Sequence, residues 1–325
     1  MLKAIKWSRT VVPVLFIALF FSAIANGQKK HVHTRTSKPA DNGRAVLWHK
    51  VDVAHEDTFL GPGGTALQPD LSHIDFIERD TTGSNLKYKI RDGSGRVWVA
   101  KIGKEAQSET AAVRLMSALG YYTDVNYLVP SLTIPTVGTF SNVRLALRPE
   151  GEKRSELWSW GKTPFEGTPQ MKGLLLMMAF MNNWDLKRTN NHVLRGTEPE
   201  RYIVGDLGAT FGKTGSNSLP IFFRNGRSRN DPKGYANAKF ISGTSAYKVH
   251  VVFHGKNRSR MHNFTKEDAR WLADLLVQLK DGQIRDMFRA ANYSDNDVNL
   301  LSNAVKERIR ELDLAASDRR LAGTR

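Results

Sequence analysis

The alternation of apolar and polar residues predicts that the chain opens with strands and continues with helices. Residues 86–90 alternate apolar and basic side chains, which is typical of a strand with one buried face. Residues 74–77 are apolar and β-prone, and Asp-Gly-Ser-Gly at 92–95 is a hairpin signal before an apolar run that ends at Lys101. We therefore expect three consecutive antiparallel strands between residues 74 and 101.

The next periodic segment predicts a helix. Apolar residues and Glu109 recur at steps of three and four from Glu105 to Leu119, and Gly120 is a typical helix C-cap. Beyond it, two short extended pieces and a further strand are expected at residues 127–130, 132–135 and 143–147.

The second half of the chain reads as mainly helical. Residues 171–182 are apolar on every side, which predicts a buried central helix. Two small strands are expected around 193–194 and 202–204, and then a long loop to about Lys239. A strand at 249–254 and three helices follow, the first with a capping box of Thr265 and Asp268.

The N-terminus has the features of an export signal. Lys3, Lys6 and Arg9 precede an apolar run from Val11 to Ala25, and Ala-Ile-Ala ends it as a small-x-small cleavage site. We expect an exported protein, periplasmic or secreted, cleaved near Ala25. The alternative is an uncleaved N-terminal anchor.

Composition narrows the possible partners. The 325 residues have a formal net charge of +16 and no cysteine. This charge favours nucleotide phosphates, acidic polymers or anionic surfaces as partners, although a solvated basic surface explains most of it equally well. The sequence contains no specific nucleic-acid motif. Without disulfides, stability must come from an apolar core, and about 300 residues suffice for one or two lobes.

Candidate chemistry is concentrated after the apolar helix. Asp185 stands five residues before Asn190, with Lys187 between them, and a short apolar run ends at Asp206. Phosphoryl transfer from a nucleotide requires such a set, because one carboxylate orients the acceptor hydroxyl while another carboxylate and an amide oxygen hold metal ions. Taken separately, each motif also fits an ordinary turn.

Together these motifs resemble the protein-kinase-like superfamily, whose catalytic loop reads H-R-D-L-x-x-x-N and whose metal loop reads D-F-G. Asp185-Leu186-Lys187 and Asn190 match the first motif, but Asn183-Trp184 replaces its His-Arg. Leu207 replaces the Phe of the second. Val-Ala-Lys, ending at Lys101, is similar to the third strand of a kinase N-lobe.

The resemblance implies a role for each candidate residue. Lys101 would position the nucleotide phosphates and Glu109 would hold Lys101, with Glu105 as the second choice. Gly83 and Ser84 would lie in the loop over the phosphates. The remaining residues would act at the reaction centre: Asp185 and Lys187 in catalysis, Asn190 and Asp206 as ligands of magnesium or manganese. The short Lys-to-Glu spacing indicates a divergent, atypical branch.

The resemblance also implies an α+β, two-lobed kinase-like fold. The expected order is a signal peptide (1–25), a flexible linker (26–70), a β-rich N-lobe (71–148) and a helical C-lobe (149–325). The expected activity is a metal-dependent transfer of the γ-phosphate of ATP, or another nucleoside triphosphate, to a hydroxyl of a protein, sugar or small molecule. The alternatives are a secreted pseudokinase-type module that binds nucleotide or polyanion without catalysis, and a basic envelope protein that binds acidic polymer.

Overall fold

The computed structural model describes residues 45–81, 85–149, 151, 153–195, 199–215 and 226–317. The predicted signal peptide and its cleavage site lie outside these ranges, as do Gly83 and Ser84. Of the helices in the described part of the chain, none combines the length and the apolar character needed to cross a membrane.

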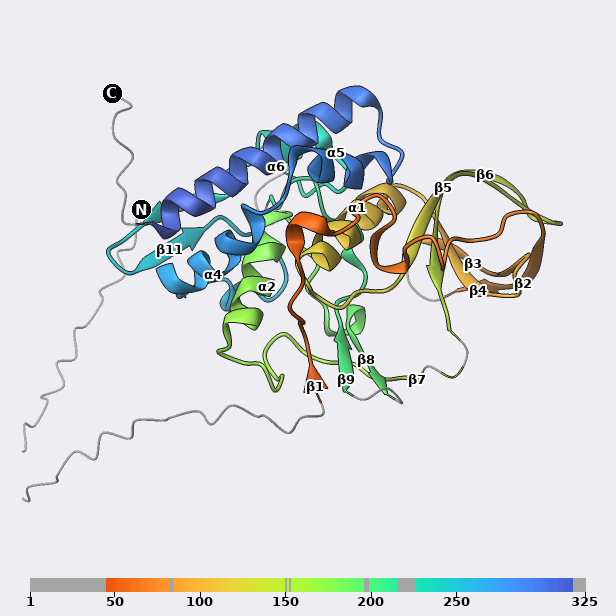
Figure 1. Ribbon diagram of the computed structural model, residues 1–325, viewed down its shortest axis with the longest axis horizontal. Helices are drawn as coiled ribbons and strands as arrows, with labels where there is room; N and C mark the ends of the chain where they lie inside the picture. The colour runs from red at the N-terminus through yellow and green to blue at the C-terminus, as the bar shows by residue number, and fades with distance from the viewer. Residues whose placement is uncertain are drawn as a thin grey trace, which may run out of the picture. The chain divides into compact units, whose positions relative to one another are not determined.

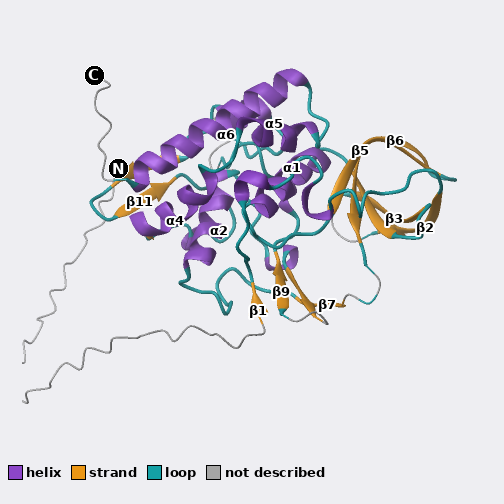
Figure 2. Ribbon diagram, viewed as in Figure 1, coloured by secondary structure: helices purple, strands orange, loops and turns teal. Residues whose placement is uncertain are grey.

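An antiparallel five-stranded sheet forms the first part of the fold (Figures 1 and 2). The alternation at residues 86–90 is observed, because Tyr88 and Ile90 are buried in one apolar cluster with Trp98. The predicted three-stranded meander is therefore confirmed. In spatial order the strands are β2 (Ile74–Asp80), β3 (Leu86–Asp92), β4 (Val97–Ile102), β6 (Gly138–Leu147) and β5 (Asn126–Ile134).

Strand β5 differs from the sequence-based prediction of two separate extended pieces. It is one strand that continues through Pro130, with Val129 opposite Val143 and Ser131 opposite Ser141. Proline has no N–H to donate to a neighbouring strand, so it is tolerated mainly on an edge strand. Strand β5 lies at the edge of the sheet, which explains why Pro130 does not interrupt it.

Helix α1 (Glu105–Ala118) lies between β4 and β5 in sequence and packs against both. The helix predicted from Glu105 to Leu119 is therefore confirmed. Leu119 follows as its C-cap, and Gly120 has φ +88°. A side chain at Gly120 would also overlap the carbonyl oxygen of His49. Glycine is therefore required at this helix end for both its backbone angle and its small size.

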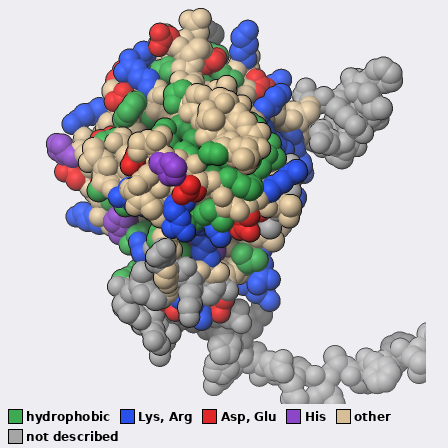
Figure 3. Space-filling view, turned by 90° about the vertical axis from the view of Figure 1, so that its right-hand side faces the viewer, with side chains coloured by type: hydrophobic (Ala, Val, Ile, Leu, Met, Phe, Trp, Pro, Cys, Tyr) green, Lys and Arg blue, Asp and Glu red, His purple; other side chains and the backbone are tan. Residues whose placement is uncertain are grey.

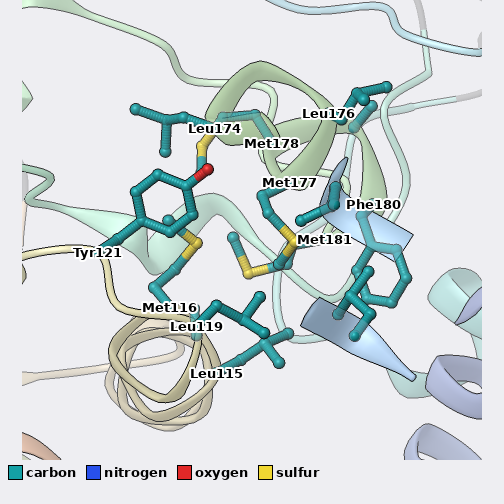
Figure 4. Packing of buried hydrophobic residues seen from close by; sticks show 14 of the residues in the cluster. Leu115, Met116, Leu119, Tyr121, Leu174, Leu176, Met177, Met178, Phe180 and Met181 are labelled. Atoms are coloured by element: carbon teal, nitrogen blue, oxygen red, sulfur yellow. The ribbon is translucent and has the colours of Figure 1, made fainter. Parts of the chain in front are cut away.

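The second part of the molecule is mainly helical. Thr168 caps α2 by accepting a hydrogen bond from the backbone N–H of Met171, and most of this helix is buried as predicted. Figure 4 shows Met177 and Met181 of this region beside Leu115 of α1. The fold is thus α+β, with a strand-rich first part and a helical second part. The helices are α2 (Pro169–Phe180), α3 (Pro232–Ala236), α4 (Lys266–Leu276), α5 (Asp281–Arg289) and α6 (Asp295–Ala316).

A buried arginine of α6 fixes the end of α2. Arg308 donates hydrogen bonds to the carbonyl oxygen of Phe180 at 2.6 Å and to Asn182 Oδ1 at 3.2 Å. Its other Nη atom donates to the carbonyl oxygens of Tyr235 and Ala238. Burial lowers the pKa of Arg308, yet these acceptors stabilise its charge. The chain therefore leaves α2 in a fixed direction, toward the candidate catalytic loop.

Two small sheets complete the second part. The predicted pair of small strands, β8 and β9, is confirmed, whereas β10, β12 and α3 were not predicted. Helix α3 has no clear apolar period, because it has only five residues and Gly234 is one of them. The Asp231 side chain caps this helix by accepting a hydrogen bond from the backbone N–H of Gly234. The first sheet has four strands, in the spatial order β1 (Ala45–Val46), β9 (Glu200–Ile203), β8 (His192–Arg195) and β7 (Lys153–Glu156). The second has three strands, in the order β10 (Ile241–Thr244), β11 (Lys248–Val251) and β12 (Phe264–Thr265).

The segment from 45 to 70 was predicted as part of a flexible linker, but in the structure it packs on the fold. Strand β1 pairs with β9, and Val53 is fully buried. Gln283 of α5 donates hydrogen bonds to the carbonyl oxygens of Val53 and Glu56. The distant side chains that hold the segment are not visible in its local sequence.

Candidate active site

A cavity of about 600 Å³ lies where the five-stranded sheet, α1 and the loops that follow α2 meet. Most of the residues that line it are charged, and they come from distant parts of the sequence. Six of the eight predicted site residues are among them. These six are Lys101, Glu109, Asp185, Lys187, Asn190 and Asp206.

Lys101 is the centre of the ionic network in this cavity. It is 4% exposed, and its Nζ lies 2.6 Å from Glu105 Oε2, 2.9 Å from Glu109 Oε2 and 3.0 Å from Asp206 Oδ1. The two glutamates are four residues apart on α1, so they lie on the same face of the helix, one turn from each other. Both candidates for the helix carboxylate therefore contact the strand lysine.

The two glutamates also connect to different parts of the protein. Glu109 Oε1 accepts from Arg144 Nη1 of β6 at 3.0 Å. Glu105 binds Asn85 Nδ2 at 2.6 Å through Oε2, and its Oε1 pairs with Arg229. Buried carboxylates require such partners, because an unpaired buried charge costs several kcal/mol, on the order of 3–5.

Asp206 is fixed beside Lys101 by the backbone around it. It adopts a left-handed conformation (φ 45°, ψ 61°) and precedes a short 3-10 helix at Leu207–Ala209. Ser108 of α1 donates a hydrogen bond to the carbonyl oxygen of Gly208 at 2.9 Å. Burial alone would raise the pKa of Asp206, but the neighbouring ammonium of Lys101 keeps it below the usual value. Asp206 is thus an anion at neutral pH.

The candidate catalytic loop holds Asp185 between two lysines. Lys187 Nζ lies 2.6 Å from Asp185 Oδ2, and Lys256 Nζ lies 3.2 Å from Oδ1. The side-chain Nδ2 of Asn190 donates a hydrogen bond to the backbone carbonyl oxygen of Asp185 at 2.8 Å. This hydrogen bond closes the loop and leaves the Asn190 side-chain oxygen as an acceptor.

Gly205 brings the Asp206 loop against the catalytic loop. A Cβ at this position would overlap the carbonyl oxygen of Asn190. Gly205→Ala should therefore separate the two loops and weaken any ligand that both loops hold, with a loss of stability of about 1–3 kcal/mol. Chemical denaturation and ligand titration of this variant would measure both effects.

Gly243→Ala is the matched control for this prediction, since a Cβ at Gly243 meets no atom within 4 Å. Equal behaviour of the two alanine variants would contradict the proposed contact between the loops.

Asn190 and Asp206 have the donor chemistry for a divalent metal on a phosphate ligand. Each keeps an oxygen free of the contacts above: Oδ1 of Asn190 and Oδ2 of Asp206. In the described part of the chain, no group of three or more His, Asp or Glu side chains is arranged to hold a metal by itself. Mg²⁺ typically takes one or two protein carboxylates and completes its shell with water and phosphate oxygens. The two residues fit that kind of site.

A second charged cluster lines the cavity and was not predicted. Asp124 lies 2.8 Å from Arg154 and 3.4 Å from His192, with Arg148 at 3.9 Å. Burial would raise the pKa of Asp124, but the close contact with His192 and the charges of the two arginines hold it well below the usual value.

Other functional candidates were missed because they lie far from the motifs in sequence. Arg229 belongs to the long loop predicted to end at about Lys239. Its guanidinium lies over the Trp184 ring at 5.0 Å and pairs with Glu105. Lys256 had no assigned role. Trp158 and Trp160 are buried. A basic residue within a strand, such as Arg144 of β6, gives no sequence signal by itself.

Comparisons with known proteins give limited information. No protein-family model matches the chain, and no curated protein sequence matches it. Among solved structures, the chain is similar to a Helicobacter pylori proinflammatory kinase, CtkA, with a TM-score of 0.46 and 11% sequence identity. The match covers 77% of this chain and 98% of that chain.

Proposed function

We propose that this protein is a metal-dependent phosphotransferase that moves the γ-phosphate of a nucleotide, such as ATP, to a hydroxyl group. The observation that carries the proposal is the buried Lys101, which contacts two carboxylates of α1 and Asp206 in the cavity that also contains Asp185 and Asn190. A bound nucleotide supplies the phosphoryl group, and magnesium or manganese offsets its negative charge.

The charge of the cavity suits an anionic ligand. Among the described residues that line it, eight are Lys or Arg and six are Asp or Glu, an excess of two positive charges. On the face drawn in Figure 3, blue Lys and Arg side chains lie scattered among red acidic ones. The cavity therefore combines an excess of positive charge with a concave shape, whereas the described charges scattered on that face do not form such a site.

Each residue has a chemical task in this proposal. Lys101 orients the phosphates and Lys187 offsets charge that develops on the transferred group. The amide oxygen of Asn190 and the carboxylate of Asp206 hold the metal ion. Asp185 accepts a hydrogen bond from the acceptor hydroxyl and takes its proton as the new P–O bond forms.

A thermal-shift experiment tests the metal and nucleotide site. ATP with Mg²⁺ or Mn²⁺ should raise the melting temperature, because a ligand at 100 times its Kd stabilises a protein by about 2.7 kcal/mol. Asp206→Ala should remove most of the metal-dependent part of this shift. Asp75→Ala, which removes a largely exposed carboxylate on β2, should respond like the wild type.

If Asp206→Ala and the wild type respond equally, Asp206 is not the metal ligand. If the wild type shows no shift with any nucleotide and metal, the phosphotransferase proposal fails.

The second candidate function is nucleotide binding without catalysis. It is favoured by the two lysines that contact the two oxygens of Asp185, because these ammonium groups compete with an acceptor hydroxyl for the carboxylate. Nucleotide binding is common to both candidates, and only turnover distinguishes them.

A further inference from the structure

Lys256 is held at the site by a segment of three consecutive residues, Gly255, Lys256 and Asn257, which matches no recognised motif. The backbone N–H of Lys256 donates to the carbonyl oxygen of Trp184 at 2.9 Å, and Asn257 Nδ2 donates to the carbonyl oxygen of Leu186 at 2.5 Å. A Cβ at Gly255 would lie only 2.6 Å from the Trp184 carbonyl oxygen. The 255–257 segment thus contacts the backbone on both sides of Asp185 and places the Lys256 ammonium beside the Asp185 carboxylate.

The two oxygens of Asp185 have different environments. Oδ2 accepts the close contact from Lys187 at 2.6 Å. Oδ1 is buried and accepts no hydrogen bond from any residue that the structure describes, although the Lys256 ammonium is 3.2 Å away. Buried polar atoms are normally hydrogen-bonded, so Oδ1 is the oxygen that a bound group would be expected to use.

The lysines carry more charge than Asp185 can neutralise. One carboxylate faces two ammonium groups, whose side chains are 42% and 49% exposed. An ammonium has three N–H donors, and Lys256 directs one contact toward Asp185. A hydroxyl that binds Oδ1 takes the place of this contact, which leaves Lys256 without its anionic partner at the edge of the cavity.

We propose that the acceptor is itself an anion, with a carboxylate or phosphate group close to the reacting hydroxyl, and that Lys256 binds this group. The inference rests on the proposed phosphotransferase function. The acceptor hydroxyl replaces Lys256 at Oδ1, and the acceptor anion becomes the new partner of the ammonium. The P–O bond to the acceptor forms, the bond between the γ-phosphorus and the bridging oxygen of the nucleotide breaks, and the proton passes to Asp185. The acceptor anion is unchanged.

The test compares glycerol, glycerate and glycerol 3-phosphate as acceptors, with ATP and Mg²⁺ present and ADP release as the readout. The two charged probes should have kcat/KM values roughly tenfold or more above glycerol, the range expected for a hydrogen bond between charged groups. Lys256→Met should remove most of this preference, and Lys256→Arg should retain part of it.

Lys306→Met is the matched control, because Lys306 forms an ion pair with Asp281 at 2.9 Å and does not line the cavity. It should keep the full preference for charged acceptors. All variants should also keep the nucleotide-dependent thermal shift, which shows that they are folded.

Equal ADP release with the three probes, whether high or absent, would overturn the proposal, as would an unchanged preference in Lys256→Met. Equal but measurable release, or an unchanged preference, is distinct from failure of the phosphotransferase function itself, in which the wild type shows no nucleotide-dependent shift or releases no ADP with any of the three probes.

Discussion

Asp185→Asn should lower turnover by about 10² or more while nucleotide affinity changes little. Asparagine has nearly the same shape, but its amide cannot take the proton of the acceptor hydroxyl. In the site, Asp185 contacts Lys187 and Lys256, whereas Lys101 contacts Asp206. The nucleotide side of the cavity should therefore remain intact in this variant.

Two measurements separate these effects: ADP release, with or without an acceptor, and the thermal shift with ATP and metal. Asp274→Asn is a suitable control, since Asp274 is a largely exposed residue of α4 paired with Arg270. Wild-type turnover that survives in Asp185→Asn would remove this residue from the reaction. A wild type that binds nucleotide but has no turnover would favour the non-catalytic function.

Lys101→Met should weaken nucleotide binding and turnover together, and it should also destabilise the fold. The substitution leaves Glu105, Glu109 and Asp206 without the cation that they share. Arg144 and Arg229 still neutralise the two glutamates in part, so we expect a loss of about 3 kcal/mol, near the lower limit for breaking a buried ion pair.

The pH dependence of this variant follows from Asp206. In the wild type its lowered pKa means that its ionised form stabilises the protein at neutral pH, and this contribution is lost as the pH falls through the folded-state pKa. Without Lys101, the pKa of Asp206 loses its largest lowering contribution and should rise from its wild-type value. The stability difference from wild type should therefore be largest at neutral pH and shrink as the pH falls below about 4, through the folded-state pKa of the wild type.

Urea denaturation at several pH values would measure this trend. Lys89→Met is the control on the neighbouring strand, where Lys89 forms a partly exposed ion pair with Glu78. A deficit in Lys101→Met that is independent of pH would contradict the assignment of its origin to Asp206.

Local sequence was sufficient for the elements whose side chains repeat regularly. The meander from 74 to 101 and helix α1 show clear periods of two and about 3.6 residues. The contact between Lys101 and Glu109 follows from the kinase-like resemblance and not from their spacing along the chain. Helix α2 is predictable for a different reason, which is its continuous apolar run at residues 174–180.

Features that depend on distant residues were not predictable in this way. Residues 45–70 are held by β9 and by Gln283, more than 150 residues away in sequence. Lys256 reaches Asp185 through backbone contacts to Trp184 and Leu186. No local period or motif records such contacts, because they arise only when the chain has folded.

The pairing of Lys101 with two glutamates gives the site redundancy. A substitution at Glu109 would leave Lys101 with Glu105, and a substitution at Glu105 would leave it with Glu109. The two losses are not equivalent, because the first releases Arg144 of the sheet and the second releases Arg229 of the loop before α3. The position of the lysine is thus robust to single substitutions, while each glutamate separately determines which neighbouring segment stays attached to it.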